Sequence, residues 1–267
     1  LRDLKAEGVE IFQVEPYLEI LLGIHEFFAD GHRPEDLNKG SIQYPVYLAE
    51  RNVTGALLSY YQTAMTGSFG KTIKAILEFA RRDAARFRLR DSLRAQALAP
   101  LIKRYPSNFI EAGVIHYALK RRLQRYVPSE MPIKMEFLAD TALKSIGEKG
   151  HLYGPGDQLT LLYLFHPDAA DGDRHQLFAG RSIIYSKIIE KEEISDDLKM
   201  FPHLRDELAC IRITRQLTLN DCRSLFPLVR RAPSRDARQI VADYRTGKNY
   251  ESQDKMLPLK SDYKEKK

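Results

Sequence analysis

Residues 108–116 read Asn108-Phe109-Ile110-Glu111-Ala112-Gly113-Val114-Ile115-His116. A short apolar run that lies between turn residues and a glycine is typical of a buried strand. Residues 9–15 and residues 133–138 show related patterns, with apolar and β-branched side chains in short runs. We therefore predict three strands, one in each of these segments.

Helical patterns fill the chain between the predicted strands. Pro16 stops the first strand and suits the first turn of a helix. Long helical patterns cover residues 44–66 and 71–104, with an interruption left open near residues 87–89, and a short basic helix is expected at 117–126. This order of strands and helices indicates an α/β fold with a mostly parallel sheet and flanking helices.

The signals after residue 140 are helical. A turn at residues 154–156 precedes Asp157, a residue type that suits the cap of a helix. Further helices are expected at residues 177–191, 202–212, 218–230 and 234–244. We therefore expect an all-helical extension after the α/β part.

The chain has 267 residues and a mass of 30.8 kDa, which allows one large domain or two small ones. We predict an α/β domain over residues 1–140 and a helical domain over residues 145–247. The polar stretch at residues 248–267 is expected to be a flexible tail that frays.

The composition excludes several classes of protein. Hydrophobic residues make up 43% and charged residues 29%, which is the composition of a globular protein rather than a disordered, collagenous or membrane protein. No apolar run approaches the roughly 18 residues that a membrane span needs. Cys210 and Cys222 form no CxxC pair, so we expect free thiols and a cytoplasmic location.

The positive charge is concentrated in one part of the chain. The formal net charge is +6, yet 14 Lys and Arg residues lie between Lys71 and Arg125 against 4 Asp and Glu residues. This excess indicates either a surface for an anion or nucleic acid or the solvated faces of amphipathic helices. No nucleic-acid-binding motif supports the first alternative, so nucleic acid is the less expected partner.

Three polar side chains are expected at the carboxyl edge of the predicted sheet, where α/β proteins bind ligands. Glu15 ends the first strand, and His116 follows the strand at 108–112 after a turn that Gly113 allows. Arg90 lies on the helix that leads into this strand. A glutamate, an arginine and a histidine that meet there would form a polar site for a metal or an oxyanion.

Each of these residues also has a plain structural interpretation. Glu15 can be an exposed residue before a helix, where negative charge suits the helix dipole. The step from Arg88 to Asp91 can be a surface ion-pair ladder, which contributes little stability. His116 can cap the helix that follows it. The sequence leaves these alternatives open.

The order of three short motifs along the chain resembles that of a known superfamily. The strand Val9-Glu10-Ile11-Phe12-Gln13-Val14-Glu15 ends in an acidic residue, and it is followed by the run Arg90-Asp91-Ser92-Leu93-Arg94-Ala95-Gln96-Ala97 and by the G-x-x-H motif of residues 113–116. Over about residues 1–140, this order resembles the Tiki/TraB/ChaN-like (erythromycin-esterase-like) superfamily.

The resemblance implies an α/β sheet with a polar site at its carboxyl edge. Characterised branches of the superfamily include metal-dependent proteases, esterases and haem- or iron-associated proteins. The resemblance implies that His116 is the histidine of the second motif, Glu15 the strand carboxylate and Arg90 the arginine, with Arg88 as the alternative. In that family a first strand and a first G-x-x-H motif precede the glutamate strand, and this sequence lacks both before Glu15.

The first functional hypothesis is a metal-assisted hydrolase of this superfamily. A divalent Mn, Zn or Fe ion, held by Glu15 and His116, would activate water or polarise a carbonyl group of a small-molecule or peptide substrate. Arg90 would stabilise the negative charge that develops. The absent first motif counts against this hypothesis.

Two other hypotheses come from different classes of function. The second is a binding or regulatory module in which the C-terminal helices contact a protein partner or a second copy of the chain. The third is an anion or nucleic-acid binder that uses the basic helices between Lys71 and Arg125. A salt-sensitive gel shift would distinguish the third from the others.

Overall fold

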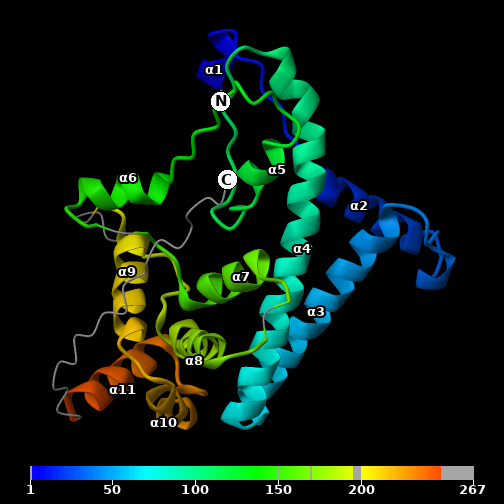
Figure 1. Cartoon of the computed structure of the whole chain (residues 1–267). Helices are drawn as coiled ribbons and strands as arrows, with labels where there is room; N and C mark the ends of the chain where they lie inside the picture. Colours follow the sequence, from blue (N-terminus) through cyan, green and yellow to red (C-terminus); the bar gives the residue numbers. More distant parts are fainter. Residues whose placement is uncertain (1, 150, 169, 195–199, 248–267) are drawn as a thin grey trace.

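A computed structural model describes residues 2–149, 151–168, 170–194 and 200–247. Its regular structure is helical, and the described residues contain no β-strand (Figure 1). The predicted α/β fold and its parallel sheet are therefore wrong. The predicted flexible tail at residues 248–267 lies outside the described residues.

The helices follow one another along the chain, joined by short turns in some places and by long irregular segments on both sides of α5. In order, they are α1 Arg2–Ala6, α2 Pro16–Ala29, the 3-10 helix η1 Pro34–Asp36, α3 Gln43–Thr66, α4 Phe69–Arg104, α5 Leu119–Leu123, α6 Leu138–Ser145, α7 Pro155–Phe165, α8 Asp173–Ile188, α9 Pro202–Arg215, α10 Leu219–Val229 and α11 Ser234–Gly247.

The three predicted strands form irregular segments instead. Residues 9–15, 108–113 and 132–137 have no regular secondary structure. Their apolar side chains Val14, Ile110 and Ile133 pack against a cluster on α4 and α5. A β-branched run favours an extended strand only when a neighbouring strand completes the ladder of hydrogen bonds. Here a helical surface covers these side chains, so no sheet is formed.

Helix α4 is the central element of the fold and spans 36 residues. It runs along the whole molecule, with α3 beside its first half (Figure 1). Ser68 caps its first turn by accepting a hydrogen bond from the Lys71 backbone N–H at 3.4 Å. The helix has no interruption at residues 87–89, because Phe87 continues the buried stripe that joins it to its neighbours.

The largest core cluster joins α4 to helices from both halves of the chain. Ile76 and Ala84 of α4 belong to the same buried cluster as Leu159 of α7, Phe178 of α8 and Phe226 of α10. This cluster crosses residue 145, where we place a domain boundary from the sequence. The boundary itself stays a prediction.

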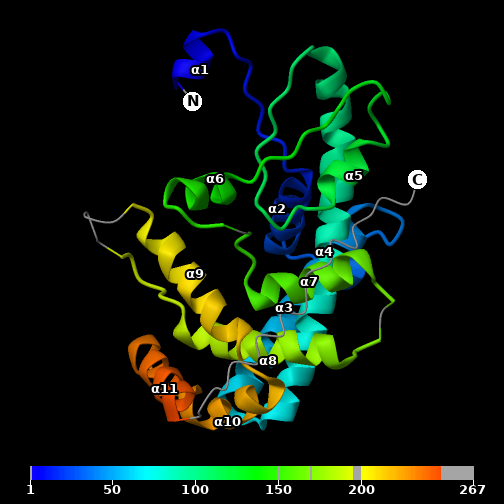
Figure 2. The same cartoon turned by 60° about the vertical axis from the view of Figure 1, so that its left-hand side comes forward.

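Helices α8, α9, α10 and α11 pack together; in Figure 2, α8, α10 and α11 lie below α7 and α9 lies to its left. The helices expected here are present, and α8 begins at Asp173, four residues before the expected start. Helix α7 begins at Pro155, two residues before Asp157, so Asp157 is not the N-cap residue that we expected; it lies in the first turn and accepts a hydrogen bond from the N–H of Gly154, the N-cap residue, at 3.0 Å.

The part of the chain that the structure describes has no helix that combines the length and the apolar character needed to span a membrane.

The two cysteines lie inside the second core cluster as free thiols. Burial raises the pKa of Cys210 to about 11 and that of Cys222 to about 12. Because the thiolate is the reactive form, we expect neither thiol of the folded protein to react with Ellman's reagent at mildly alkaline pH. Both should react after unfolding in guanidinium chloride. A fast stoichiometric reaction of the native protein would contradict this packing.

Candidate functional site

The middle of α4 carries two buried polar clusters. The first, called the Glu15 cluster, consists of Glu15, Arg90 and Arg94. The second, called the Asp91 cluster, consists of Asp91, His116 and Arg122. Arg90 and Asp91 are consecutive residues of a helix and therefore point about 100° apart, which is why they belong to different clusters.

In the Glu15 cluster, one carboxylate binds two guanidinium groups. Arg90 donates from Nε to Oε1 at 3.1 Å and from Nη2 to Oε2 at 2.9 Å, which is the bidentate geometry of a strong ion pair. Arg94, one turn further along α4, also contacts Oε2. The three side chains are between 10% and 19% exposed, so this ion pair is largely shielded from solvent.

Glu15 occupies the position just before α2, but its side chain does not cap that helix. The carboxylate reaches α4 instead, while the Glu15 carbonyl oxygen accepts hydrogen bonds from the Leu18 and Glu19 N–H groups. The interpretation of Glu15 as an exposed residue before a helix is therefore wrong. Its contacts fix the start of α2 against the middle of α4.

In the Asp91 cluster, a fully buried carboxylate binds the predicted histidine. Asp91 Oδ1 lies 2.5 Å from His116 Nδ1, and the two side chains are 0% and 6% exposed. The ring of Phe87 lies edge-on to the imidazole at 5.3 Å between ring centres. The turn that Gly113 was expected to allow is formed, since the His116 N–H donates to the Gly113 carbonyl oxygen at 2.9 Å.

Two buried atoms of the Asp91 cluster have no hydrogen-bond partner among the described residues. They are Oδ2 of Asp91 and Nε of Arg122. Burial lowers the pKa of Arg122, the charge of Asp91 raises it, and the like charges of Arg125 and Arg121 lower it again. The cluster therefore combines a buried aspartate with a buried, incompletely partnered arginine whose pKa the aspartate raises.

The structure brings together only part of the predicted site. Glu15 and Arg90 are in direct contact, whereas His116 is bound by Asp91. Arg88, the alternative arginine, donates to the Tyr163 carbonyl oxygen at 2.7 Å. No sheet edge gathers the three predicted residues.

Sequence reasoning missed Arg94, Asp91 and Arg122 as members of these clusters. The spacing of Arg90 and Arg94 places both on one helix face, which is a signal that could have identified Arg94. The contact between Asp91 and His116 joins residues 25 positions apart, and no local pattern predicts a contact of that range.

The predicted metal ligands do not fit a metal. Glu15 already binds two arginines, and His116 belongs to the other cluster, so the two side chains do not form a common set of metal ligands. Within the described ranges, no group of three or more His, Cys, Asp or Glu side chains could hold an ion. The metal-binding hydrolase expected from the sheet edge therefore lacks both the sheet and a suitable set of donors.

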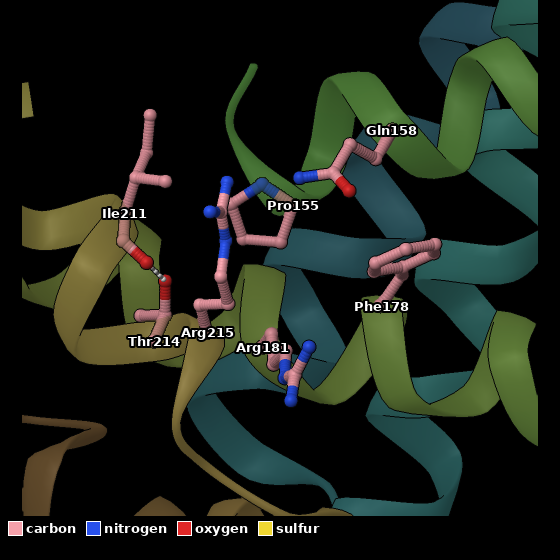
Figure 3. A pocket seen from close by; sticks show the side chains of 7 residues that line it. All are labelled: Pro155, Gln158, Phe178, Arg181, Ile211, Thr214 and Arg215. Atoms are coloured by element: carbon pink, nitrogen blue, oxygen red, sulfur yellow. Dashed lines mark hydrogen bonds between the residues drawn. The ribbon is translucent and has the colours of Figure 1, made fainter. Parts of the chain in front are cut away.

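A small cavity between α7, α8 and α9 is too narrow for a substrate. Figure 3 shows Arg181 and Arg215 beside it, together with Thr214, whose Oγ1 donates to the Ile211 carbonyl oxygen at 3.2 Å. Its volume of about 20 Å³ is close to the minimum for one water molecule. Arg181 moreover donates to the Leu217 carbonyl oxygen at 2.9 Å, which gives it a structural role.

Comparison with known proteins gives one relative. An "Uncharacterized protein" of Archaeoglobus fulgidus is 28% identical over 227 residues, which cover 85% of this chain and 73% of the relative. No family model matches the chain. No solved structure matches it. The resemblance to the Tiki/TraB/ChaN-like superfamily therefore stays a prediction.

Replacing Glu15 by Gln removes the carboxylate that Arg90 and Arg94 share. We expect the free energy of unfolding to fall by about 3 kcal/mol, because removing one partner of a buried ion pair leaves an uncompensated charge. Urea unfolding followed by circular dichroism measures this change.

Glu78→Gln is the matched control, because Glu78 also binds two arginines but is 41% exposed. An exposed ion pair contributes at most about 1 kcal/mol, so this variant should unfold nearly as the parent protein does. Equal losses in the two variants would show that Glu15 has no special role.

Proposed function

We propose that this protein is a binding module for a polyanionic partner. The proposed contact surface, called the basic α5 surface, consists of Lys120, Arg121 and Arg122 of α5 together with Arg125 just after it. The observation that carries the proposal is the gathering of these four cations, of which only Arg122 interacts with a carboxylate, that of the buried Asp91.

Half of the ten cations on α4 are paired with carboxylates of the described residues. Arg81 and Arg82 bind Glu78, Arg86 binds Asp83 at 2.6 Å, and Arg90 and Arg94 bind Glu15. By contrast, none of the four residues of the basic α5 surface forms a salt bridge with another described residue. The unpaired part of the charge excess between Lys71 and Arg125 therefore includes these four residues, although Lys74 and other cations of α4 also form no salt bridge with a described residue.

The like charges at this surface repel one another. The pKa of Arg122 is lowered first by burial and also by Arg125 and Arg121, with only Asp91 and Tyr126 acting in the opposite direction. The pKa of Arg88 is lowered by burial and then by Arg122. Such repulsion opposes folding in the free protein, and a bound polyanion would relieve it.

Exposed aromatic rings accompany these cations. Phe109 is 86% exposed and Tyr126 is 36% exposed. Ile110, next to Phe109, packs on the same cluster as Leu119 and Leu123 of α5, so Phe109 lies in a segment that borders α5. Cations interleaved with exposed aromatic rings favour a single-stranded nucleic acid over other polyanions, because bases can stack on the rings.

The double variant Arg121→Glu/Arg125→Glu tests this proposal. We expect a labelled single-stranded oligonucleotide to bind at least about tenfold more weakly at low salt. The plot of log affinity against log salt should become shallower by about 1.4, because each lost phosphate contact on a single strand accounts for roughly 0.7. Fluorescence anisotropy over a range of salt concentrations measures both quantities.

Arg231→Glu/Arg235→Glu is the charge-matched control, since both residues are exposed and lie far along the chain at the start of α11. This control should retain most of the affinity. Polyglutamate in place of the oligonucleotide reveals whether any polyanion binds. Failure of both probes to bind, or equal losses in the two double variants, would refute the proposal.

The other hypotheses stay predictions with less support. The hydrolase rests on the family resemblance, and its expected divalent Mn, Zn or Fe ion has no suitable donor set among the described residues. A partner surface on the C-terminal helices, for a protein or a second copy, would use exposed apolar residues such as Leu228, which is 55% exposed. A cytoplasmic location is supported by the two free, buried cysteines.

A further inference from the structure

A second cavity lies at the first turn of α4. Its volume is about 280 Å³, and its lining comes from the first turns of α4, α8 and α10 and from the residue Asp171 before α8. We propose that this cavity binds a small amphiphile with one anionic headgroup and a short alkyl chain.

The walls of the cavity are mainly apolar. Phe69, Ile73 and Leu77 of α4 face Leu219 of α10 across it. At about 30 Å³ for each water-sized group, the volume holds roughly nine such groups. A short alkyl chain fits this space, whereas a folded partner or a peptide helix needs a much longer groove.

Two cationic side chains line the cavity. Lys74 and Arg223 both line it and are exposed, and neither forms a salt bridge with another described residue. The guanidinium of Arg223 lies 5.9 Å from the ring centre of Phe69 and donates to the Asn220 side chain at 3.3 Å. Its position over an apolar wall is suited to a ligand with a charged head and an apolar tail.

The one acidic residue of the lining is already neutralised. Asp171 accepts from Arg81 at 2.7 Å and also from the Tyr163 hydroxyl group. The first turn of α4, which contains Gly70 of the lining, has no acidic residue to offset the positive end of the helix dipole. The local field therefore adds to the charges of Lys74 and Arg223 in favouring an anion.

Isothermal titration of the full chain with octanoate, octyl phosphate and octan-1-ol, each below its critical micelle concentration, tests the proposal. We expect saturable binding of at least one of the two anions, and at least about tenfold weaker binding of the alcohol. The tighter of the two anions identifies the headgroup as a carboxylate or a phosphate ester.

Two variants separate the headgroup contact from the fit of the chain. Lys74→Gln/Arg223→Gln should weaken anion binding at least about tenfold and leave octan-1-ol unaffected. Gly70→Trp should abolish binding, because a Cβ at Gly70 meets no atom within 4 Å and a large side chain there can fill the cavity without disturbing the helix.

Gly70→Ala and Arg231→Gln/Arg235→Gln are the controls for size and for net charge, and both should bind as the parent protein does. Circular dichroism confirms that each variant is folded. The proposal is overturned if no anion binds saturably, if the alcohol binds as tightly as the anions, or if Gly70→Trp and Lys74→Gln/Arg223→Gln both retain full affinity.

Discussion

The ion pairs between Glu15 and the two arginines of α4 constrain how the first part of the chain can lie. The irregular segment before α2 has no regular hydrogen bonding of its own, so its position depends on side-chain contacts. Glu15 at its end is held by Arg90 and Arg94, and Val14 beside it packs on the α4–α5 cluster. Glu10 and Phe12 of the same segment contact Tyr105 after the end of α4, so charged, apolar and aromatic contacts with α4 and its flanks together place this segment.

Helix α4 distributes its charge unequally along its length and around its axis. Where carboxylates from α2, α3 or α4 itself are near, its arginines are neutralised within the fold, as Arg86 is by Asp83 and Glu50. Where α5 packs on it, arginines of the two helices lie close to one another, and the buried Asp91 is the main opposing charge for Arg122. A mild net charge for the whole chain therefore conceals a local concentration of charge, and local concentrations govern the binding of ions.

The helices could be predicted from the sequence because their apolar residues recur with the helical period over many turns. The start of α2 at Pro16 could also be predicted, because proline suits the first turn of a helix. The absence of a sheet could not be predicted. A short segment such as residues 133–138 shows a local preference for an extended conformation, but its sequence does not show whether a neighbouring strand is present to pair with it. From the sequence we predict that Glu15 and Arg90 lie close together, and they are in contact. The contact between His116 and Asp91 could not be predicted, because it depends on how the chain returns to α4.

The unbroken course of α4 has a consequence for communication within the protein. Gly70 lies at one end of this helix and Leu98, where α5 packs, lies toward the other. At 1.5 Å per residue, about 40 Å of rigid helix separates them, several times the Debye length of about 8 Å at physiological salt. A charge at one end of the helix therefore has almost no electrostatic effect at the other end. Any influence between the two ends must be mechanical, through a tilt or shift of the helix as a single rod.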